Sequence, residues 1–314
     1  MQYHYSIIIP HYNSPELLLR CLRSIPIRED IQVIVVDDCS PGADKYLSLY
    51  PELSRPFLEL YSTAKGGSAG RARNVGLQHA TGKWLVFADS DDYFDEGLGA
   101  FLDVHVDAQE DMIYFKPRPE NEDFFPQRIK DIYYLFDCAD ESLMRFHYIT
   151  PWGKLIKREL VEKNQIRFSE VRWGNDAFFV TQCAVLAKAI CKTSNTLYVV
   201  MEREGSLTHT TDQYFPETQC RLHEDIKCYN FAVTHKFKPI DEALYSRCRN
   251  IINDRHLLLF ARVYKSLPSS IKPQIRKRIT HGLNMTGRLL YNLLFFLSHF
   301  TSKLPLDNKF SESQ

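Results

Sequence analysis

The sequence has no excess of charge of either sign, because 39 lysines and arginines balance 39 aspartates and glutamates. A net charge of zero gives no electrostatic reason to expect a polyanionic partner, and no nucleic-acid-binding module is visible, so nucleic acid is not expected as a ligand. The eight cysteines include no Cys-x-x-Cys pair. A chain of this length can bury a core without disulfide bonds, so we expect reduced thiols and a cytoplasmic protein.

Signals for secretion and for membrane spanning are also missing. The first residues, Met-Gln-Tyr-His-Tyr, lack the basic start and apolar run of a signal peptide. The apolar stretch 289–300 has twelve residues, whereas a spanning helix needs about 20. Because basic residues flank it, residues 272–303 can lie peripherally on the anionic cytoplasmic face of a membrane. A tail helix that covers the rest of the chain, or a dimer contact, is an equal alternative, and the oligomeric state stays open.

What the sequence does contain is a regular alternation of apolar runs and helical stretches. Mostly apolar, β-branched runs are typical of parallel strands that are buried on both faces. We expect such strands at 5–9, 31–36, 57–61 and 84–88, and helices at 14–24 and 69–80. In the first helix, Ser14 can act as the cap and Pro15 fits the first position. The alternation predicts an α/β sheet with helices on both faces.

Four polar or glycine-rich segments follow the predicted strands. They are residues 10–13, 37–38, 66–70 and 89–92. In open α/β sheets, ligands bind beyond the carboxyl ends of the strands. We therefore expect the four segments to line one crevice.

The segment Asp89-Ser90-Asp91-Asp92 brings three carboxyl groups together directly after a predicted buried strand. Such groups repel one another unless a cation or hydrogen-bond donors neutralise them. Oxygen ligands suit Mg²⁺ and Mn²⁺, which often bind one or two carboxylates together with substrate phosphates. An acidic helix cap explains the cluster equally well when it is taken alone. Its position beside the other three segments favours a metal site.

Two further segments suit a nucleotide. Asp38 ends a predicted strand, where a carboxylate can accept a hydrogen bond from a base or a ribose, although a simple turn is the alternative. Residues 65–74 form a glycine-rich loop that enters a helix carrying Arg71 and Arg73. Backbone N–H groups, the helix dipole and guanidinium groups together favour phosphate.

These blocks resemble, in order and spacing, family 2 glycosyltransferases of the GT-A fold. The resembling segments are 7–13, 33–40, 70–76, 80–92, 151–155, 168–176 and 203–206. The resemblance implies a Rossmann-like α/β domain over 1–212, with a donor-binding half at about 1–115 and an acceptor and base half at about 116–212. Residues 213–314, which it does not reach, read as a mostly helical C-terminal region with a basic, apolar tail.

The resemblance also implies roles for single residues. Donor-binding residues would be Pro10, Tyr12, Asn13, Asp38, Gly67, Arg73, Asp89 and Ser90. Asp91 would hold a divalent cation, Mn²⁺ or Mg²⁺, and Asp92 is more structural in character. Asp176 would be the general base, with Glu170 as the alternative. The chain departs from the family at Cys39, where glycine is common, and at Asn175-Asp176, where Glu-Asp is frequent.

The remaining candidates rest on residue type alone. His209 can bind the metal or the diphosphate, although a structural histidine is more common. Trp152 and Trp173 can stack on an acceptor sugar, and Lys154 and Asn175 can contact the acceptor, whereas core packing is the alternative for the tryptophans and a solvated lysine for Lys154.

Together these features predict a metal-dependent transferase that moves a sugar from a nucleoside diphosphate to a hydroxyl of a glycan or lipid-linked glycan. The family resemblance implies that the transfer inverts the anomeric carbon and that UDP is the default nucleotide. In such a reaction a carboxylate takes the proton of the hydroxyl as it attacks. A sugar-nucleotide nucleotidyltransferase and a non-catalytic nucleotide- or glycan-binding protein remain as alternatives.

Overall fold

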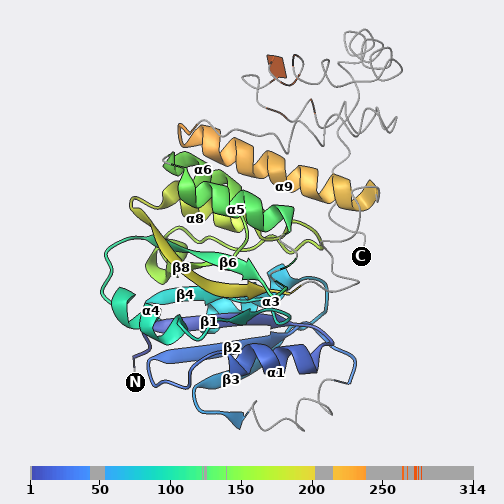
Figure 1. The fold of residues 1–314 in the computed structure, drawn as a ribbon. Coiled ribbons are helices and arrows are strands. Elements are labelled where there is room, and N and C mark those ends of the chain that lie inside the picture. Colours follow the sequence, from blue (N-terminus) through green and yellow to red (C-terminus); the bar gives the residue numbers. More distant parts are fainter. Residues whose placement is uncertain are drawn as a thin grey trace. The chain divides into compact units, whose positions relative to one another are not determined.

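The computed structural model describes residues 2–42, 54–121, 123, 126–138, 140–201 and 215–237, with scattered positions between 264 and 277. By its internal contacts the chain divides into Met1–Ile240 and Asp241–Gln314. All strands and helices named below belong to the first unit (Figure 1). It extends past residue 212, the boundary expected from the sequence, because the last helix of this unit packs on an earlier one. His209 and most of the predicted tail at 272–303 lie outside the described residues.

Within the described residues, the strands form one eight-stranded sheet in the order β3-β2-β1-β4-β7-β6-β8-β5. The strands are β1 Tyr5–His11, β2 Ile31–Asp37, β3 Leu58–Ser62, β4 Trp84–Phe87, β5 Tyr93–Phe94, β6 Met112–Pro119, β7 Lys154–Lys157 and β8 Ile190–Val200. The four strands expected from apolar runs are β1 to β4, each within a few residues of its predicted bounds. The α/β fold class is confirmed.

The first half of the sheet is parallel. Strand β1 lies between β2 and β4, so that Tyr5 is level with both Ile31 and Trp84, and β3 extends the parallel set beyond β2. Strand β7 then pairs antiparallel with β4 and with β6. Because β1 to β4 run in one direction, their carboxyl ends lie along the same edge of the sheet.

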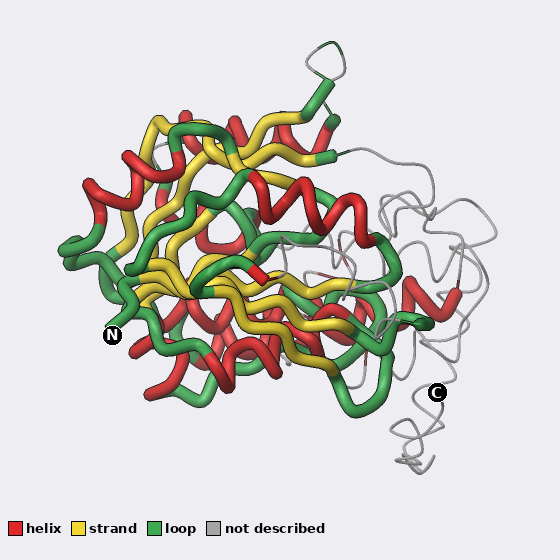
Figure 2. The backbone as a smooth tube through the Cα atoms, turned by 90° about the horizontal axis from the view of Figure 1, so that it is seen from below, coloured by secondary structure: helices red, strands yellow, loops and turns green. Residues whose placement is uncertain are grey.

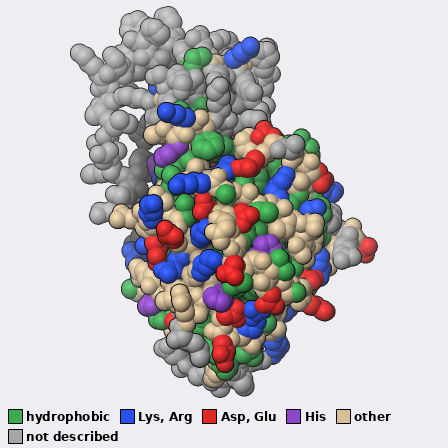
Figure 3. Space-filling model, turned by 90° about the vertical axis from the view of Figure 1, so that its left-hand side faces the viewer, with side chains coloured by type: hydrophobic (Ala, Val, Ile, Leu, Met, Phe, Trp, Pro, Cys, Tyr) green, Lys and Arg blue, Asp and Glu red, His purple; other side chains and the backbone are tan. Residues whose placement is uncertain are grey.

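Helices cover the sheet, and Figure 2 shows strands between helices. They are α1 Pro15–Arg23, α3 Ala69–His79, α4 Leu98–His105, α5 Gln127–Asp137, α6 Glu141–His147, α7 Arg158–Lys163, α8 Ala177–Leu186 and α9 Phe215–Thr234. Among the described residues, no helix combines the length and the apolar character needed to cross a bilayer. On the face drawn in Figure 3, acidic and basic side chains are interspersed, as the zero net charge suggests.

Packing of α1 and α3 brings their first turns to the edge where the strands end. Pro15 stands at the start of α1 as predicted, but Ser14 does not cap it through its side chain. Its hydroxyl donates to the carbonyl of Tyr12 instead (3.1 Å). Helix α3 lies close to β1 because Gly76 has no side chain: a Cβ there would overlap the Ile8 side chain. The close approach carries Arg71, Arg73 and Asn74 to the strand ends.

Candidate donor and metal site

The four segments that follow the parallel strands do meet, as predicted. The backbone N–H of Asn13, after β1, donates to Ser40 Oγ, after β2 (2.7 Å). The N–H of Gly67, in the glycine-rich loop, donates to Asp38 Oδ2 (2.9 Å). From α3, which begins directly after that loop, Arg73 forms an ion pair with Asp89, after β4 (2.5 Å). One connected group of polar side chains therefore lines this edge of the sheet.

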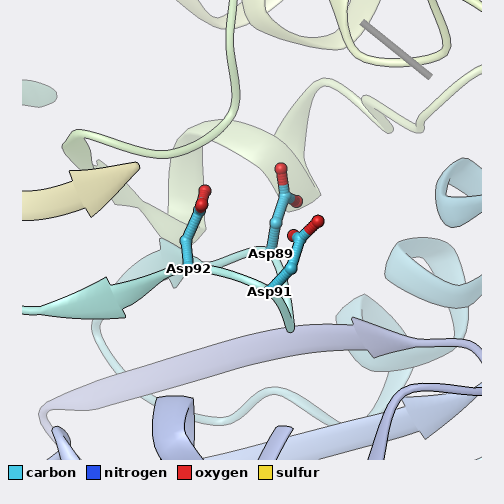
Figure 4. A group of neighbouring side chains, drawn as sticks. All are labelled: Asp89, Asp91 and Asp92. Carbon is cyan, nitrogen blue, oxygen red and sulfur yellow. The ribbon is translucent and has the colours of Figure 1, made fainter. Parts of the chain in front are cut away.

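The acidic cluster at the end of β4 is compact. One carboxylate oxygen from each of Asp89, Asp91 and Asp92 lies within 4.8 Å of the others. Figure 4 shows the three side chains projecting from the same side of their loop. Asp89 and Asp91 are half-buried and Asp92 is 4% exposed. Burial, together with the charges of Asp89 and Asp91, raises the pKa of Asp92 well above its usual value.

Asp92 is part of the fold rather than of a binding surface. Its Oδ1 accepts a hydrogen bond from the backbone N–H of Met201, at the end of β8 (2.8 Å). Tyr198 hydrogen-bonds the Asp92 carboxyl, and its hydroxyl accepts from the N–H of Asp89 (2.9 Å). Tyr198 of β8 and Met201, which follows β8, therefore hold the acidic loop in place.

The residues of this loop fit a hard divalent cation. The half-buried carboxylates of Asp89 and Asp91 can supply oxygen ligands, which Mn²⁺ and Mg²⁺ prefer. Burial is the main cause of the raised pKa of Asp92, and the charges of Asp89 and Asp91 add to it. A cation at this loop would offset the like charges.

Arg20 holds the acidic loop from the other side, and sequence reasoning missed it. Its Nη2 donates to the carbonyl oxygen of Asp91 (2.8 Å), and its Nη1 donates to Glu120 Oε1 (3.0 Å). The guanidinium also lies over the Tyr93 ring, 4.7 Å from its centre. The contact joins residues 71 positions apart, so no local pattern pointed to it.

Asp38 is held in one orientation at the end of β2. Its Oδ1 accepts from the Thr63 hydroxyl (2.8 Å) while Oδ2 accepts from the Gly67 N–H, and the residue is 8% exposed. Each carboxylate oxygen keeps a further lone pair that can accept from a nucleoside. Tyr12, which directly follows β1, is 57% exposed. Asp37, in contrast, bonds the N–H and hydroxyl of Ser40 and shapes the turn.

The two arginines of α3 have different surroundings. Arg71 donates to the carbonyls of Lys65 and Gly66 and to Glu170, and so closes the glycine-rich loop. Arg73 is 4% exposed and links two halves of the site. Its Nη2 donates to Asp89 and its Nη1 donates to Asn175 Oδ1 (3.0 Å).

Asp176 follows Asn175 directly and is the residue preceding α8. It is half-buried, and burial raises the pKa of its carboxyl; Arg73 and Arg221 oppose that rise, while the charge of Asp89 adds to it. A carboxylate with a raised pKa is a stronger base than an ordinary aspartate. The chain Asp89–Arg73–Asn175 thus joins the acidic loop to the predicted base.

Glu170, the alternative base, is engaged elsewhere. Its carboxylate accepts from Arg71 (2.9 Å) and from Asn74 (3.2 Å), and these bonds lower the pKa of Glu170. A lowered pKa weakens a general base. The geometry therefore favours Asp176 over Glu170.

Burial counts against two of the expected acceptor residues. Trp152 is 2% exposed and stacks on Tyr198, with the ring centres 5.0 Å apart. Lys154 is fully buried, donates to the backbone carbonyls of Thr150 and Trp152, and lies against the Tyr148 ring. Both side chains pack inside the core: Lys154 begins β7, a central strand of the sheet, and Trp152 lies two residues before it. Trp173 is half-buried in the loop before Asp176, with the Arg172 guanidinium over its ring.

Comparison with known proteins gives a consistent result. The model of the family described as "Glycosyl transferase family 2" matches residues 6–165. Glycosyltransferase GlyA of Streptococcus pneumoniae serotype 4 is 28% identical over 224 residues, 65% of this chain and 31% of GlyA. Poly(ribitol-phosphate) beta-N-acetylglucosaminyltransferase TarS of Staphylococcus aureus is 27% identical over 259 residues, 76% of this chain and 43% of TarS. The chain spans about a third to two fifths of the length of these relatives.

Two solved structures share the fold. Residues 1–349 of S. aureus TarS in complex with UDP-GlcNAc superpose with a TM-score of 0.58 at 20% identity, covering 98% of this chain and 94% of that one. The mannosyltransferase PcManGT of Pyrobaculum calidifontis, in complex with GDP-Man and Mn²⁺, gives a TM-score of 0.52 at 18% identity, covering 97% and 77%. The GT-A architecture of the described residues is thereby established.

Proposed function

Since the chain belongs to glycosyl transferase family 2, we propose that it is an inverting, metal-dependent glycosyltransferase that uses a nucleoside-diphosphate sugar, with UDP as the first choice. The observation that carries the proposal is the pair of hydrogen bonds by which Arg73 joins Asp89 of the acidic loop to Asn175, the residue directly before Asp176. These bonds join a donor-side acid to the neighbour of a half-buried carboxylate with a raised pKa. A mere binding protein would have no need for that base.

The donor half supplies the binding contacts. Asp38, oriented by Thr63 and Gly67, accepts from the base or ribose of the nucleoside, and Tyr12 offers an exposed aromatic face beside Pro10 and Asn13. Asp89 and Ser90 lie toward the ribose and diphosphate, with Arg73 holding Asp89 in place. UDP-GlcNAc bound to TarS, a relative of the same fold, makes a UDP-sugar the first donor to test.

Asp91, with help from Asp89, would hold Mn²⁺ or Mg²⁺. Such an ion, when bound, supplies positive charge where the diphosphate leaves. The carbonyl contact from Arg20 keeps the Asp91 backbone in position for this role. The Mn²⁺ complex of PcManGT supports a divalent cation in this fold.

Asp176 takes the proton from the acceptor hydroxyl as the hydroxyl attacks the anomeric carbon. Attack on the side opposite the leaving group inverts that carbon, and no covalent intermediate with the protein is required. Arg73, through Asn175, fixes the backbone just before the base. The site thus holds the leaving group with one half and the proton acceptor with the other.

The acceptor is proposed to be a glycan or lipid-linked glycan of a bacterial surface polymer. The names of TarS and of other relatives, which act on poly(ribitol phosphate), support a polymer acceptor. Trp173 and Asn175 remain the candidate acceptor contacts, because Trp152 and Lys154 are buried. Location on the cytoplasmic face of a membrane through residues 272–303 is a further part of the proposal, and it concerns residues outside those described.

A panel of sugar nucleotides tests the function. With Mn²⁺ present, one or more donors should release free nucleoside diphosphate and should raise the melting temperature, since a ligand at 100 times its Kd adds about 2.7 kcal/mol to stability. Adding EDTA should stop the release, and Asp91→Asn should need a higher Mn²⁺ concentration to reach half of its maximal rate. Binding without turnover by any donor would favour the non-catalytic alternative, and pyrophosphate-dependent nucleotide exchange would favour the nucleotidyltransferase.

A further inference from the structure

Helix α9 lies beyond the residues matched by the family model, yet it contacts the segment that ends at the proposed base. We call residues 168–176 the base loop. The helix packs on α8, which begins just after Asp176. Nothing in the sequence marked any residue of α9 as part of the site.

The contact centres on a buried carboxylate. Glu224 is 1% exposed, and its Oε2 accepts a hydrogen bond from the Ser169 hydroxyl (2.6 Å). Its Oε1 accepts from Lys227 Nζ (2.7 Å), which also lies 3.4 Å from Ser169 Oγ. A buried charge is costly unless it is paired and hydrogen-bonded. Glu224 meets both conditions, and its partner outside α9 is Ser169 of the base loop.

Ser169 in turn holds the far end of the base loop. Its backbone N–H donates to the carbonyl of Asn175 (3.2 Å), the residue before Asp176. Its carbonyl oxygen lies against Gly70 of α3, so closely that a Cβ there would overlap it. Ser169 is thus the point at which α9, α3 and the two ends of the base loop meet.

Two other residues on the same face of α9 contact this loop. Cys220 Sγ lies 3.2 Å from the carbonyl of Trp173, and a Cβ on Gly174 would lie within 3.8 Å of Arg221 and Glu224. The spacing of Cys220, Glu224 and Lys227 puts them on one side of a helix. Helix α9 therefore supports the loop along its length, and Glu224 is the polar anchor.

We propose that Glu224 is a positioning residue for catalysis, which sets the place of Asp176 by holding Ser169. The proposal rests on the role of Asp176 as base. It predicts that loss of the Glu224–Ser169 bond lowers turnover and leaves donor binding intact, because the residues proposed to contact the nucleoside, Asp38 and Tyr12, lie outside both the base loop and α9. A misplacement of the base by about 1 Å can cost up to about 100-fold in rate.

The test uses the full chain with Mn²⁺ and the sugar nucleotide that gives the fastest diphosphate release. Glu224→Gln and Ser169→Ala should each lower kcat by about 10- to 100-fold, while KM for the donor and the thermal shift caused by UDP stay as in the parent. Ser169→Thr, which keeps the hydroxyl, should restore most of the rate. The double variant should be no slower than either single one, because both remove the same bond. Glu162→Gln, the same change in an exposed pair with Arg158, is the control and should not alter kcat.

A structural role alone would lower the melting temperature without this split between kcat and KM. If Glu224→Gln does not fold, Ser169→Ala decides the matter. Full kcat in Ser169→Ala, or additive losses in the double variant, would overturn the proposal. Asp176→Asn separates this failure from failure of the proposed function. If Asp176→Asn keeps its rate, Asp176 is not the base, and the role of Glu224 is refuted with it. If Asp176→Asn loses most of its rate while Ser169→Ala keeps full activity, only the role of Glu224 is refuted.

Discussion

Asp176 combines burial with proximity to a second acid, and both raise its pKa. As a general base it must be deprotonated to act, and base catalysis contributes about 100- to 10,000-fold in typical enzymes. We expect Asp176→Asn to lower kcat by that range and to leave UDP binding unchanged, as steady-state kinetics and a UDP thermal shift can measure. In the parent enzyme, kcat should fall as the pH is lowered, because Asp176 becomes protonated. The fall should begin at a higher pH than it would for a base with the usual pKa of an aspartate.

The same raised pKa has a cost in stability. A carboxyl whose pKa is higher in the folded state than in the unfolded state destabilises the fold above the folded-state pKa, and the penalty disappears below the unfolded-state pKa. Asp176→Asn should therefore melt at a higher temperature than the parent near pH 7. The difference should shrink as the pH approaches the usual aspartate range. A lower melting temperature for the variant at neutral pH would show that the charge of Asp176 is not a strain on the fold.

At the scale of single residues, the acceptor contacts that were predicted from residue type alone fared worst. Trp152 is buried, which is the core-packing alternative to an acceptor contact, whereas Lys154 is buried although both readings placed it at the surface. Lys154 begins the antiparallel strand β7, which inserts between β4 and β6. Local sequence carries no sign of that insertion. The carboxylates of the acidic loop were easier to foresee, since they follow the uninterrupted apolar run 84–88, which is typical of a buried strand.

At the scale of elements, α3 depends on glycine where it meets the base loop. A Cβ on Gly70 would overlap Ser169 O and approach Asn175 Cβ to 3.0 Å. Gly70→Ala should therefore push the base loop away, with a loss of about 1–3 kcal/mol in stability and a fall in kcat. Chemical denaturation and kinetics measure both.

Gly99 in α4 provides the matched control. The nearest atom to a Cβ there is Arg28 Nη1 at 3.9 Å, so alanine fits. Because alanine has the higher helix propensity, Gly99→Ala should leave kcat unchanged and should add up to about 1 kcal/mol of stability. Equal effects of the two substitutions would mean that the clash at Gly70 is relieved without moving the base loop.

Elements with strong local signals were predicted well. Strands β1, β2 and β4 are apolar along nearly their whole length, and α3 begins where the glycine-rich loop ends, so their order and their carboxyl ends were evident. The short strand β5 and the partner of Glu224 were not predicted. Strand β5 pairs with the distant strand β8, and Glu224 binds a residue 55 positions away, so only folding brings these partners together. Ser14 does not cap α1 through its side chain: its ψ of 61° lies outside the β region that is typical of a capping residue, and its hydroxyl donates to the Tyr12 carbonyl.

For the whole molecule, the proposed membrane contact is open to direct test. Deleting residues 285–314 should release the protein from anionic liposomes in a flotation assay, since this segment contains the whole apolar stretch 289–300 and nearby basic residues. Neutral liposomes are the control. Unchanged binding of the shortened chain to anionic liposomes would refute the contact.

The position of β1 at the middle of the parallel strands has a consequence for synthesis on the ribosome. The first strand made pairs with β2 and with β4, whose last residue is Phe87, and β4 then requires β7, which ends at Lys157. Until that residue has left the exit tunnel, one edge of an entirely apolar strand stays open to other nascent chains. A pause in translation after β4 has emerged from the tunnel and before β7 has emerged should therefore favour aggregation, whereas a pause after β7 has emerged should favour it less.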